Sequence, residues 1–262
     1  MANRKSNQRP IVLSIAGYDP SSGAGITADI KTIAAHGCYG ISCITALTVQ
    51  STRGVSRVDP VEGRIITETL EELATDLNIS AVKIGMLGSA EGARAVAAFL
   101  KRHQPRCVVL DPVLKSSSGA DLISKEGFEV LKKRLLALAT VMTPNIEEAA
   151  VLAEMEVNNA EQMTVAAHRL QKMGVQNVVI TGGHLTVPVD LVAARDRPFT
   201  ALEGEKIASR STHGTGCAFS TSLACSLAKG KSLLNAARAA KRYIESALQK
   251  PNLIGTGIGP LI

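Results

Sequence analysis

A glycine-rich turn that opens into a helix is the stretch of this sequence whose residues could most directly perform chemistry. Residues 213–217 read HGTGC, and Phe219, Leu223 and Leu227 follow at four-residue spacing. That spacing predicts a helix with one buried face, whose first turn has unpaired N–H groups and the positive end of the helix dipole. Glycines allow such amides to approach a phosphate closely. The turn is therefore predicted to bind an anion, although glycines at this place often form only a tight turn.

Polar side chains also stand where predicted strands end. Asp111 directly follows the apolar residues 108–110, and Asn145 and Glu148 lie three residues apart, on one face of the first turn of a helix. Asp111 and Glu148 could hold Mg²⁺ through water beside phosphates. The simpler interpretations are that Asp111 is a turn residue, Asn145 an N-cap and Glu148 a partner of the helix dipole.

Two further strand ends could contact a flat ring. Gln50 could pair through its amide with an amidine-like ring edge, and Met86 could flank an aromatic ring. Gln50 could equally be an ordinary loop residue, and a methionine at a strand end is often part of the core.

The loop after the first predicted strand offers a rival nucleotide site. Residues 23–28 read GAGITA and fit the dinucleotide pattern G-x-G-x-x-A. The first glycine comes too late after the strand for the tight turn that the pattern needs, and the next strand ends at Gln50, with no acidic residue for a ribose hydroxyl. We therefore expect the loop to wrap a small substrate, with Asp29 one helical turn in. Asp29 could equally be a solvated helix residue.

Composition restricts the class of protein. The 262 residues carry 29 Lys+Arg against 23 Asp+Glu, a net charge of +6, and only 3% are aromatic. Scattered basic residues without interleaved aromatics argue against nucleic-acid binding. Five cysteines without a CxxC pair indicate free thiols in a reducing compartment, and no apolar run approaches the length of a membrane span. We expect a cytoplasmic protein whose residues 1–10 form a disordered basic tail.

Strands and helices alternate along the chain, and the strands are continuously apolar. This pattern predicts an α/β protein with a mostly parallel sheet covered by helices on both faces, in one domain over residues 11–262. Ligands of such sheets bind outside the carboxyl ends of the strands. Strands are predicted at 11–16, 41–49, 80–86, 107–110, 141–142, 177–181, 188–194 and 205–208. Helices are predicted from 26 onward and at 65–77, 90–103, 127–139, 146–154, 161–173, 217–229 and 232–249.

Taken in order, these stretches resemble a known enzyme family. They are AGYDPSSGAGITADIKT (16–32), TALTVQ (45–50), KIGML (83–87), LDPV (110–113), TPNIEEA (143–149), GGH (182–184) and THGTGC (212–217). They are similar to the bacterial hydroxymethylpyrimidine and phosphomethylpyrimidine kinases of thiamine synthesis, members of the ribokinase superfamily.

The resemblance implies a three-layer α/β/α ribokinase-like fold, commonly a homodimer, that uses ATP and Mg²⁺. The substrate would be 4-amino-5-hydroxymethyl-2-methylpyrimidine, whose hydroxymethyl group is phosphorylated, and then its monophosphate, which is phosphorylated again. Pyridoxal or pyridoxine phosphorylation is an alternative within the superfamily. A non-catalytic pyrimidine- or nucleotide-binding module is an alternative of another class.

The resemblance also implies a role for individual residues. The catalytic anion hole would consist of Gly214, Thr215, Gly216 and Cys217. The substrate would be bound by Gln50, on the aminopyrimidine edge, and by Gly17, Ala24, Asp29, Met86 and Val113. The nucleotide and its phosphates would contact Asn145, Thr181, Gly183 and Lys115, and the metal would be held by Asp111 and Glu148.

Cys217 is the candidate base of the first phosphorylation. A helix N-terminus lowers the pKa of a thiol below its ordinary value, so we expect a thiolate that accepts the proton of the substrate hydroxyl. Loss of this thiol would then slow the first phosphorylation more than the second, whose nucleophile is already an anion. The alternative is that Cys217 only packs against the ring.

The sequence departs from the family pattern at four positions. Ser22 replaces a usual glycine, and Thr181 stands where a lysine often precedes Gly-Gly-His. Ser117 is unusual before the Ser-Gly pair, and Lys115 is displaced. The missing cation at 181 either weakens phosphate binding or passes this task to Lys115.

Overall fold

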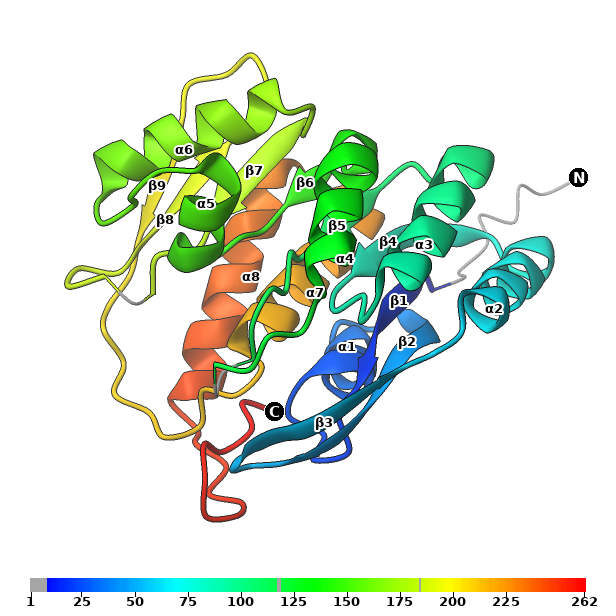
Figure 1. Ribbon diagram of the computed structural model, residues 1–262. Helices are drawn as coiled ribbons and strands as arrows, with labels where there is room; N and C mark the ends of the chain where they lie inside the picture. Colours follow the sequence, from blue (N-terminus) through cyan, green and yellow to red (C-terminus); the bar gives the residue numbers. More distant parts are fainter. Residues whose placement is uncertain (1–8, 117–118, 184) are drawn as a thin grey trace, which may run out of the picture.

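A nine-stranded sheet forms the centre of the computed structural model, which describes residues 9–116, 119–183 and 185–262 (Figure 1). Its strand order is β3-β2-β1-β4-β5-β6-β7-β8-β9. The strands are β1 (Ile11–Tyr18), β2 (Tyr39–Ser51), β3 (Gly54–Pro60), β4 (Ile79–Ile84), β5 (Val108–Leu110), β6 (Val141–Met142), β7 (Asn177–Ile180), β8 (Val189–Ala193) and β9 (Thr200–Glu203). Strands β2, β1, β4, β5, β6 and β7 run parallel, and β3, β8 and β9 are antiparallel to their neighbours.

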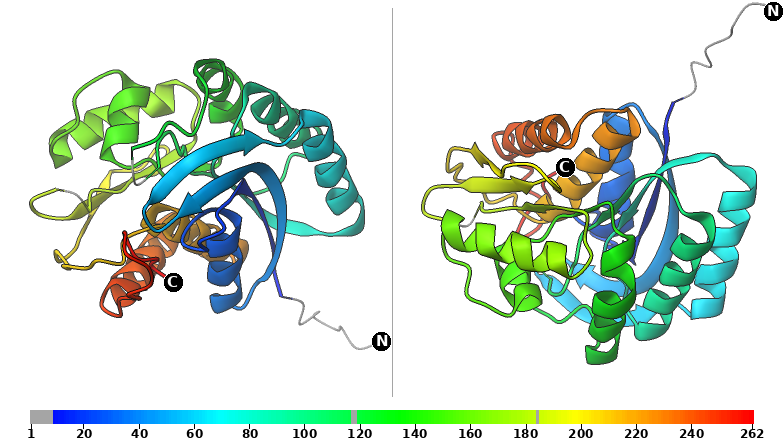
Figure 2. Two further views of the ribbon diagram at one scale, coloured as in Figure 1. Left: turned by 60° about the horizontal axis from the view of Figure 1, so that its bottom comes forward. Right: turned by 90° about the horizontal axis from the view of Figure 1, so that it is seen from above.

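Helices cover both faces of this sheet (Figure 2). One face packs on α2 (Gly63–Asp76), α3 (Ala90–His103), α4 (Lys125–Val130), α5 (Ile146–Ala153) and α6 (Ala160–Lys172). The other face packs on α1 (Gly25–Ala35), α7 (Thr215–Ala228) and α8 (Leu233–Leu248). The predicted three-layer α/β/α architecture is confirmed.

The strands are apolar on both sides because each side meets a helical layer. In β4, Val82 and Ile84 belong to the larger core cluster, whereas the preceding Ala81 belongs to the cluster under α7 and α8. In the same way, Val109 of β5 points to the second cluster, between two neighbours that point to the first. The two cores therefore alternate along each central strand, which fixes the pairing register.

Most predicted elements are present, and two predictions fail at the sheet edges. Strand β3 (Gly54–Pro60) was not predicted, because its residues are mostly exposed and carry little apolar pattern. The predicted strand at 205–208 is irregular, and the edge strand is Thr200–Glu203 instead. Residues 1–8 of the predicted tail lie outside the described residues, within which no helix is long and apolar enough to cross a membrane.

Candidate active site

A cavity of about 700 Å³ lies where the parallel strands end. This is an ordinary size for a small-molecule pocket. Its walls are the loop after β1, the inner face of β2, the segments after β4, β5 and β6, and the turn before α7. Fourteen of the sixteen residues predicted from the sequence line it: Gly17, Ala24, Gln50, Met86, Asp111, Val113, Lys115, Asn145, Glu148, Thr181, Gly214, Thr215, Gly216 and Cys217. The two that do not are Asp29 and Gly183.

The turn before α7 has the geometry of an anion cradle. Gly214 takes the N-cap position with φ +84°, and within the described part of the chain no side chain caps the helix. A Cβ on Gly214 would overlap the carbonyl oxygen of Gly23, so the turn lies directly against the loop after β1. Gly216, by contrast, has open space beside its Cα and lines the cavity. The first-turn amides and the positive end of the helix dipole therefore face the cavity, and no side chain at Gly216 covers them.

Asp29 is a correction to the sequence analysis, because its side chain is fully buried and does not line the cavity. Both of its carboxylate oxygens pair with Lys83 Nζ, at 3.0 and 2.9 Å, and it accepts a hydrogen bond from the Thr221 hydroxyl at 2.7 Å. Lys83 is also fully buried. Burial alone would lower the pKa of Lys83, but the charge of Asp29 raises it above its ordinary value, so the lysine is a permanent cation beneath the turn.

Asp111 and Glu148 form a pair of carboxylates on the cavity wall. Burial, followed by the charge of Asp111, raises the pKa of Glu148 to about 8. Burial also raises the pKa of Asp111, against the opposing charge of Lys83, whose Nζ lies 3.9 Å from Asp111 Oδ2. Two buried carboxylates that oppose each other's ionisation fit a divalent cation, which would relieve that repulsion.

The donor set for such a cation is small. No group of three or more His, Cys, Asp or Glu side chains suited to a metal occurs among the described residues. Glu148 is also held by the capping box of α5, since its Oε2 accepts from Asn145 N at 2.9 Å and its own N–H donates to Asn145 Oδ1 at 2.8 Å. Asn145 is therefore the N-cap of α5, as the simpler of its two interpretations expected. A cation here would complete its shell with water and substrate phosphate, as Mg²⁺ commonly does.

The expected thiolate at Cys217 is wrong. Burial raises the pKa of the Cys217 thiol to about 12; Lys83 opposes this shift, and the carboxylates of Asp111 and Asp29 add to it. The helix N-terminus is thus outweighed by desolvation and by two negative charges. The thiol lies in the cavity wall but stays protonated at neutral pH.

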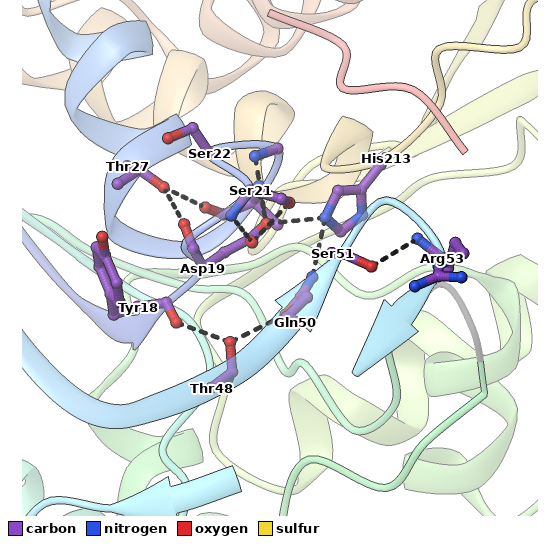
Figure 3. Close-up of polar contacts among 12 residues, drawn as sticks. Tyr18, Asp19, Ser21, Ser22, Thr27, Thr48, Gln50, Ser51, Arg53 and His213 are labelled. Atoms are coloured by element: carbon purple, nitrogen blue, oxygen red, sulfur yellow. Dashed lines mark hydrogen bonds and ion pairs between the residues drawn. The ribbon is translucent and has the colours of Figure 1, made fainter. Parts of the chain in front are cut away.

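The end of the cavity beside Gln50 contains a cluster that the motifs did not reveal (Figure 3). His213 is 8% exposed, and its Nε2 lies 2.9 Å from Asp19 Oδ2 and 3.1 Å from Gln50 Nε2. Asp19 also accepts the backbone N–H groups of Ser21 and Ala24, each at 2.8 Å. Burial would raise the pKa of Asp19, but the hydrogen bonds from His213, Ser21 and Ala24 hold it below its ordinary value. The available sequence signals were the strand-end position of Asp19 and the place of His213 beside the glycines.

The departures from the family pattern have different surroundings. Ser22 has φ +62°, in the left-handed region that favours glycine. Lys115 is exposed at the rim of the cavity, and Thr181 lies beside Asn145 through an isolated parallel bridge. Ser117 lies outside the described residues.

Comparisons with known proteins decide the family. Residues 19–262 match the model of the phosphomethylpyrimidine kinase family. The chain belongs to this family. The hydroxymethylpyrimidine/phosphomethylpyrimidine kinase of Haemophilus influenzae is 41% identical over 95% of this chain and 94% of that protein. A bifunctional thiamine biosynthesis protein of Geobacter sulfurreducens is 42% identical over 97% of this chain, which spans only 52% of it.

Solved structures agree with this assignment. A phosphomethylpyrimidine kinase from Clostridium difficile has a TM-score of 0.82 and 36% identity over 91% of this chain and 99% of that one. An ADP complex of Bacillus subtilis pyridoxal kinase has a TM-score of 0.88 and 33% identity over 97% and 96%. The resemblance, the ribokinase-like fold and the kinase function in thiamine biosynthesis that were predicted from the sequence are thus confirmed. Pyridoxal kinases are structural neighbours, but the curated relatives favour the pyrimidine kinase.

Proposed function

We propose that this kinase transfers the γ-phosphate of ATP first to the hydroxymethyl group of 4-amino-5-hydroxymethyl-2-methylpyrimidine and then to the resulting monophosphate. One observation carries this proposal. A single cavity joins a ring pocket around Gln50 and Met86 to the amide turn at Gly214–Gly216. A flat polar ring and a phosphate chain can therefore meet in one enclosed space.

Positioning and charge stabilisation supply most of the catalysis in phosphoryl transfer. The first-turn amides of α7 at Gly216 and Cys217 would donate to the oxygens of the transferred group. One such donor contributes about 10²–10³ in rate in comparable anion holes. Lys83, buried beneath the turn, adds a fixed positive charge close to the same place.

Asp111 and Glu148 are the residues that would hold Mg²⁺ in this site. The ion would supply neutralisation of phosphate charge and a template for the phosphate oxygens. Asn145, held in the capping box with Glu148, and Thr181 would contact the nucleotide phosphates. Lys115, exposed at the rim, is the cation that could replace the lysine missing at 181.

Cys217 has a packing role in this proposal rather than that of a base. A thiol with a pKa of about 12 cannot accept the hydroxyl proton at neutral pH. A loose transition state places little charge on the attacking oxygen, so the proton can leave late, to the transferred phosphate itself.

One assay tests the proposal against its alternatives. ATP consumption is measured with the hydroxymethylpyrimidine, its monophosphate and pyridoxal, each at matched concentration. We expect turnover with the first two and at least tenfold lower kcat/KM with pyridoxal. Preference for pyridoxal would support the alternative kinase, and no turnover with any of the three would support a binding module.

We also propose a homodimer. Tyr18, Leu47 and Val49 are exposed apolar residues on the outer face of the β1–β2 pair, where Tyr18 is the register partner of Leu47. A second copy of the chain would cover this patch. Light scattering should give twice the chain mass for the wild type and the monomer mass for Val49→Lys. A monomeric wild type would refute the dimer.

We place the enzyme in the cytoplasm, where ATP is available. All five cysteines lie within the described residues and are free thiols, as a reducing compartment requires. Fractionation of cells that express a tagged chain tests this location.

A further inference from the structure

Four side chains at the end of the cavity beside Gln50 form a chain of hydrogen bonds, and the position of each proton in it follows from its partners (Figure 3). His213 Nε2 lies 2.9 Å from Asp19 Oδ2 and 3.1 Å from Gln50 Nε2. On its other side, the Gln50 amide places Oε1 3.1 Å from Thr48 Oγ1, which lies 2.9 Å from the carbonyl oxygen of Tyr18. The Gln50 amide is therefore held at both of its polar atoms.

The hydrogen on His213 is determined by Asp19. The Asp19 carboxylate accepts two backbone N–H groups at 2.8 Å and the Ser21 hydroxyl at 2.7 Å, and these donors favour its ionised form. An ionised carboxylate only accepts hydrogen bonds, so the ring nitrogen 2.9 Å away carries a hydrogen. A protonated nitrogen cannot accept a hydrogen bond from the NH₂ group of Gln50. The atom of Gln50 that faces His213 must then be the carbonyl oxygen.

The Thr48 side gives the same answer independently. The single hydroxyl proton of Thr48 has an acceptor in the Tyr18 carbonyl, at 2.9 Å. Its oxygen is then left to accept, and the group of Gln50 that can donate to it is the NH₂. The oxygen and nitrogen of an amide have nearly the same shape, and their assignment follows from the hydrogen-bond network. A half-turn of the Gln50 amide satisfies both contacts at once.

We infer that Asp19 and His213 are positioning residues that fix the orientation of the Gln50 amide, and with it the hydrogen-bond pattern that the cavity presents to a ring. In this orientation the single Nε2–H of His213 is shared between Asp19 Oδ2 and the oxygen of Gln50, and the NH₂ of Gln50 donates to Thr48. One lone pair and one N–H remain for a ligand. Side by side, they match a ring nitrogen next to an amino group. A ring N–H next to a carbonyl would instead place a donor against the N–H of Gln50 and an acceptor against its oxygen. The inference rests on the proposed function and deepens it, because it names the substrate feature that is selected.

The His213 ring is held in place by its surroundings. A Cβ on Gly23 would overlap the ring, so the ring lies directly against the backbone of the loop after β1. The backbone N–H of His213 donates to the Gly259 carbonyl at 3.1 Å, and its own carbonyl accepts from Leu261 N at 3.0 Å. These bonds fix the backbone of His213, and the loop after β1 packs against one side of the ring, which keeps Nε2 between Asp19 and Gln50.

The test compares two pyrimidines that differ only in this pattern. One is 4-amino-5-hydroxymethyl-2-methylpyrimidine, and the other is its 4-oxo analogue, which has N3–H beside a carbonyl. Asp19→Ala removes the carboxylate that determines the hydrogen on His213 Nε2, which permits the opposite tautomer and frees the Gln50 amide to turn. Thr48→Val removes the second constraint without a change of shape. Ser21→Ala is the matched control, because it removes one contact of Asp19 and leaves those of His213 intact.

In the wild type we expect kcat/KM to favour the amino compound. In Asp19→Ala this preference should fall about tenfold or more, through a higher KM for the amino compound and an absolute gain for the oxo analogue. Thr48→Val should reduce the preference in the same direction, and Ser21→Ala should keep it within about twofold. General damage to the site would lower kcat/KM for both substrates together. An unchanged preference in both Asp19→Ala and Thr48→Val would overturn the inference.

A measurement that needs no variant activity completes the test. In protein labelled with ¹⁵N-histidine, the His213 resonance is assigned by its loss in His213→Gln. The inference requires a hydrogen on Nε2, and an unprotonated Nε2 would overturn it. If the wild type turns over neither pyrimidine, the proposed function fails, and the ratio of the two dissociation constants by calorimetry then tests the orientation of Gln50 by itself.

Discussion

At Gly216 an alanine should favour folding and hinder phosphate binding, so Gly216→Ala separates the two effects. The residue lies in the first turn of α7, and a Cβ there would meet no described atom within 4 Å apart from its own neighbours. Alanine is preferred to glycine inside a helix by up to about 1 kcal/mol. We therefore expect the free energy of unfolding to rise by about 0.5–1 kcal/mol, which raises the melting temperature by roughly 1–4 °C for a chain of this size.

Gly216 lines the cavity, so a methyl group added there would occupy open space next to the first-turn amides. If these amides bind the transferred phosphate, the methyl group keeps it at a distance from at least one donor. Loss of one anion-hole donor costs about 10²–10³ in kcat. Gly216→Ala should thus be slightly more stable than the wild type and at least a hundredfold slower.

The assay pairs a thermal melt with steady-state kinetics on the hydroxymethylpyrimidine and ATP. Gly214→Ala is the comparison variant. With φ +84° and the carbonyl oxygen of Gly23 in the way of its Cβ, it should lose stability and activity together. A Gly216→Ala enzyme with kcat within about threefold of the wild type would show that no phosphate approaches this turn, and would refute the proposed mechanism.

Three further predictions concern the charges around the turn. Lys83→Met should lower the free energy of unfolding, measured in urea, by about 3–5 kcal/mol, because it leaves the fully buried Asp29 carboxylate without its cation. The double variant Lys83→Met/Asp29→Leu should recover much of this loss. A Lys83→Met protein as stable as the wild type would contradict the prediction. The pKa of Glu148 rises from 4.5 to about 8 on folding, so folding takes up a proton between these values and the metal-free enzyme loses stability as pH rises through them. Glu148→Gln should flatten this loss in denaturant titrations at several pH values and also reduce Mg²⁺-dependent activity, whereas an unchanged slope would place the titration elsewhere. Since the Cys217 thiol has a pKa of about 12, the wild type and Cys217→Ala should share one pH profile of kcat. An inflection at about pH 8.5 in the wild type alone would support the role of Cys217 as a base.

Elements with a strong local pattern could be read directly from the sequence. The helix Ala90–His103 has the predicted bounds, because small and apolar residues recur there at the spacing that one buried face requires. The strand Val141–Met142 also has the predicted bounds, and both of its residues are apolar and buried. The edge strands β3 and β9 were missed or misplaced, since a strand with exposed residues carries no such pattern. Their pairing depends on a neighbouring strand that is already in place.

The motif residues, their order and the family were determined by the sequence alone, and so was the expectation that strand-end residues meet in one cavity. Tertiary structure decided what those residues can do there. Asp29 became a buried partner of Lys83, and the thiol of Cys217 stayed protonated. His213 met Asp19 across 194 positions of the chain and Gln50 across 163. Desolvation, charge interaction and hydrogen-bond direction depend on every group that surrounds an atom, and those groups come together only in the folded chain.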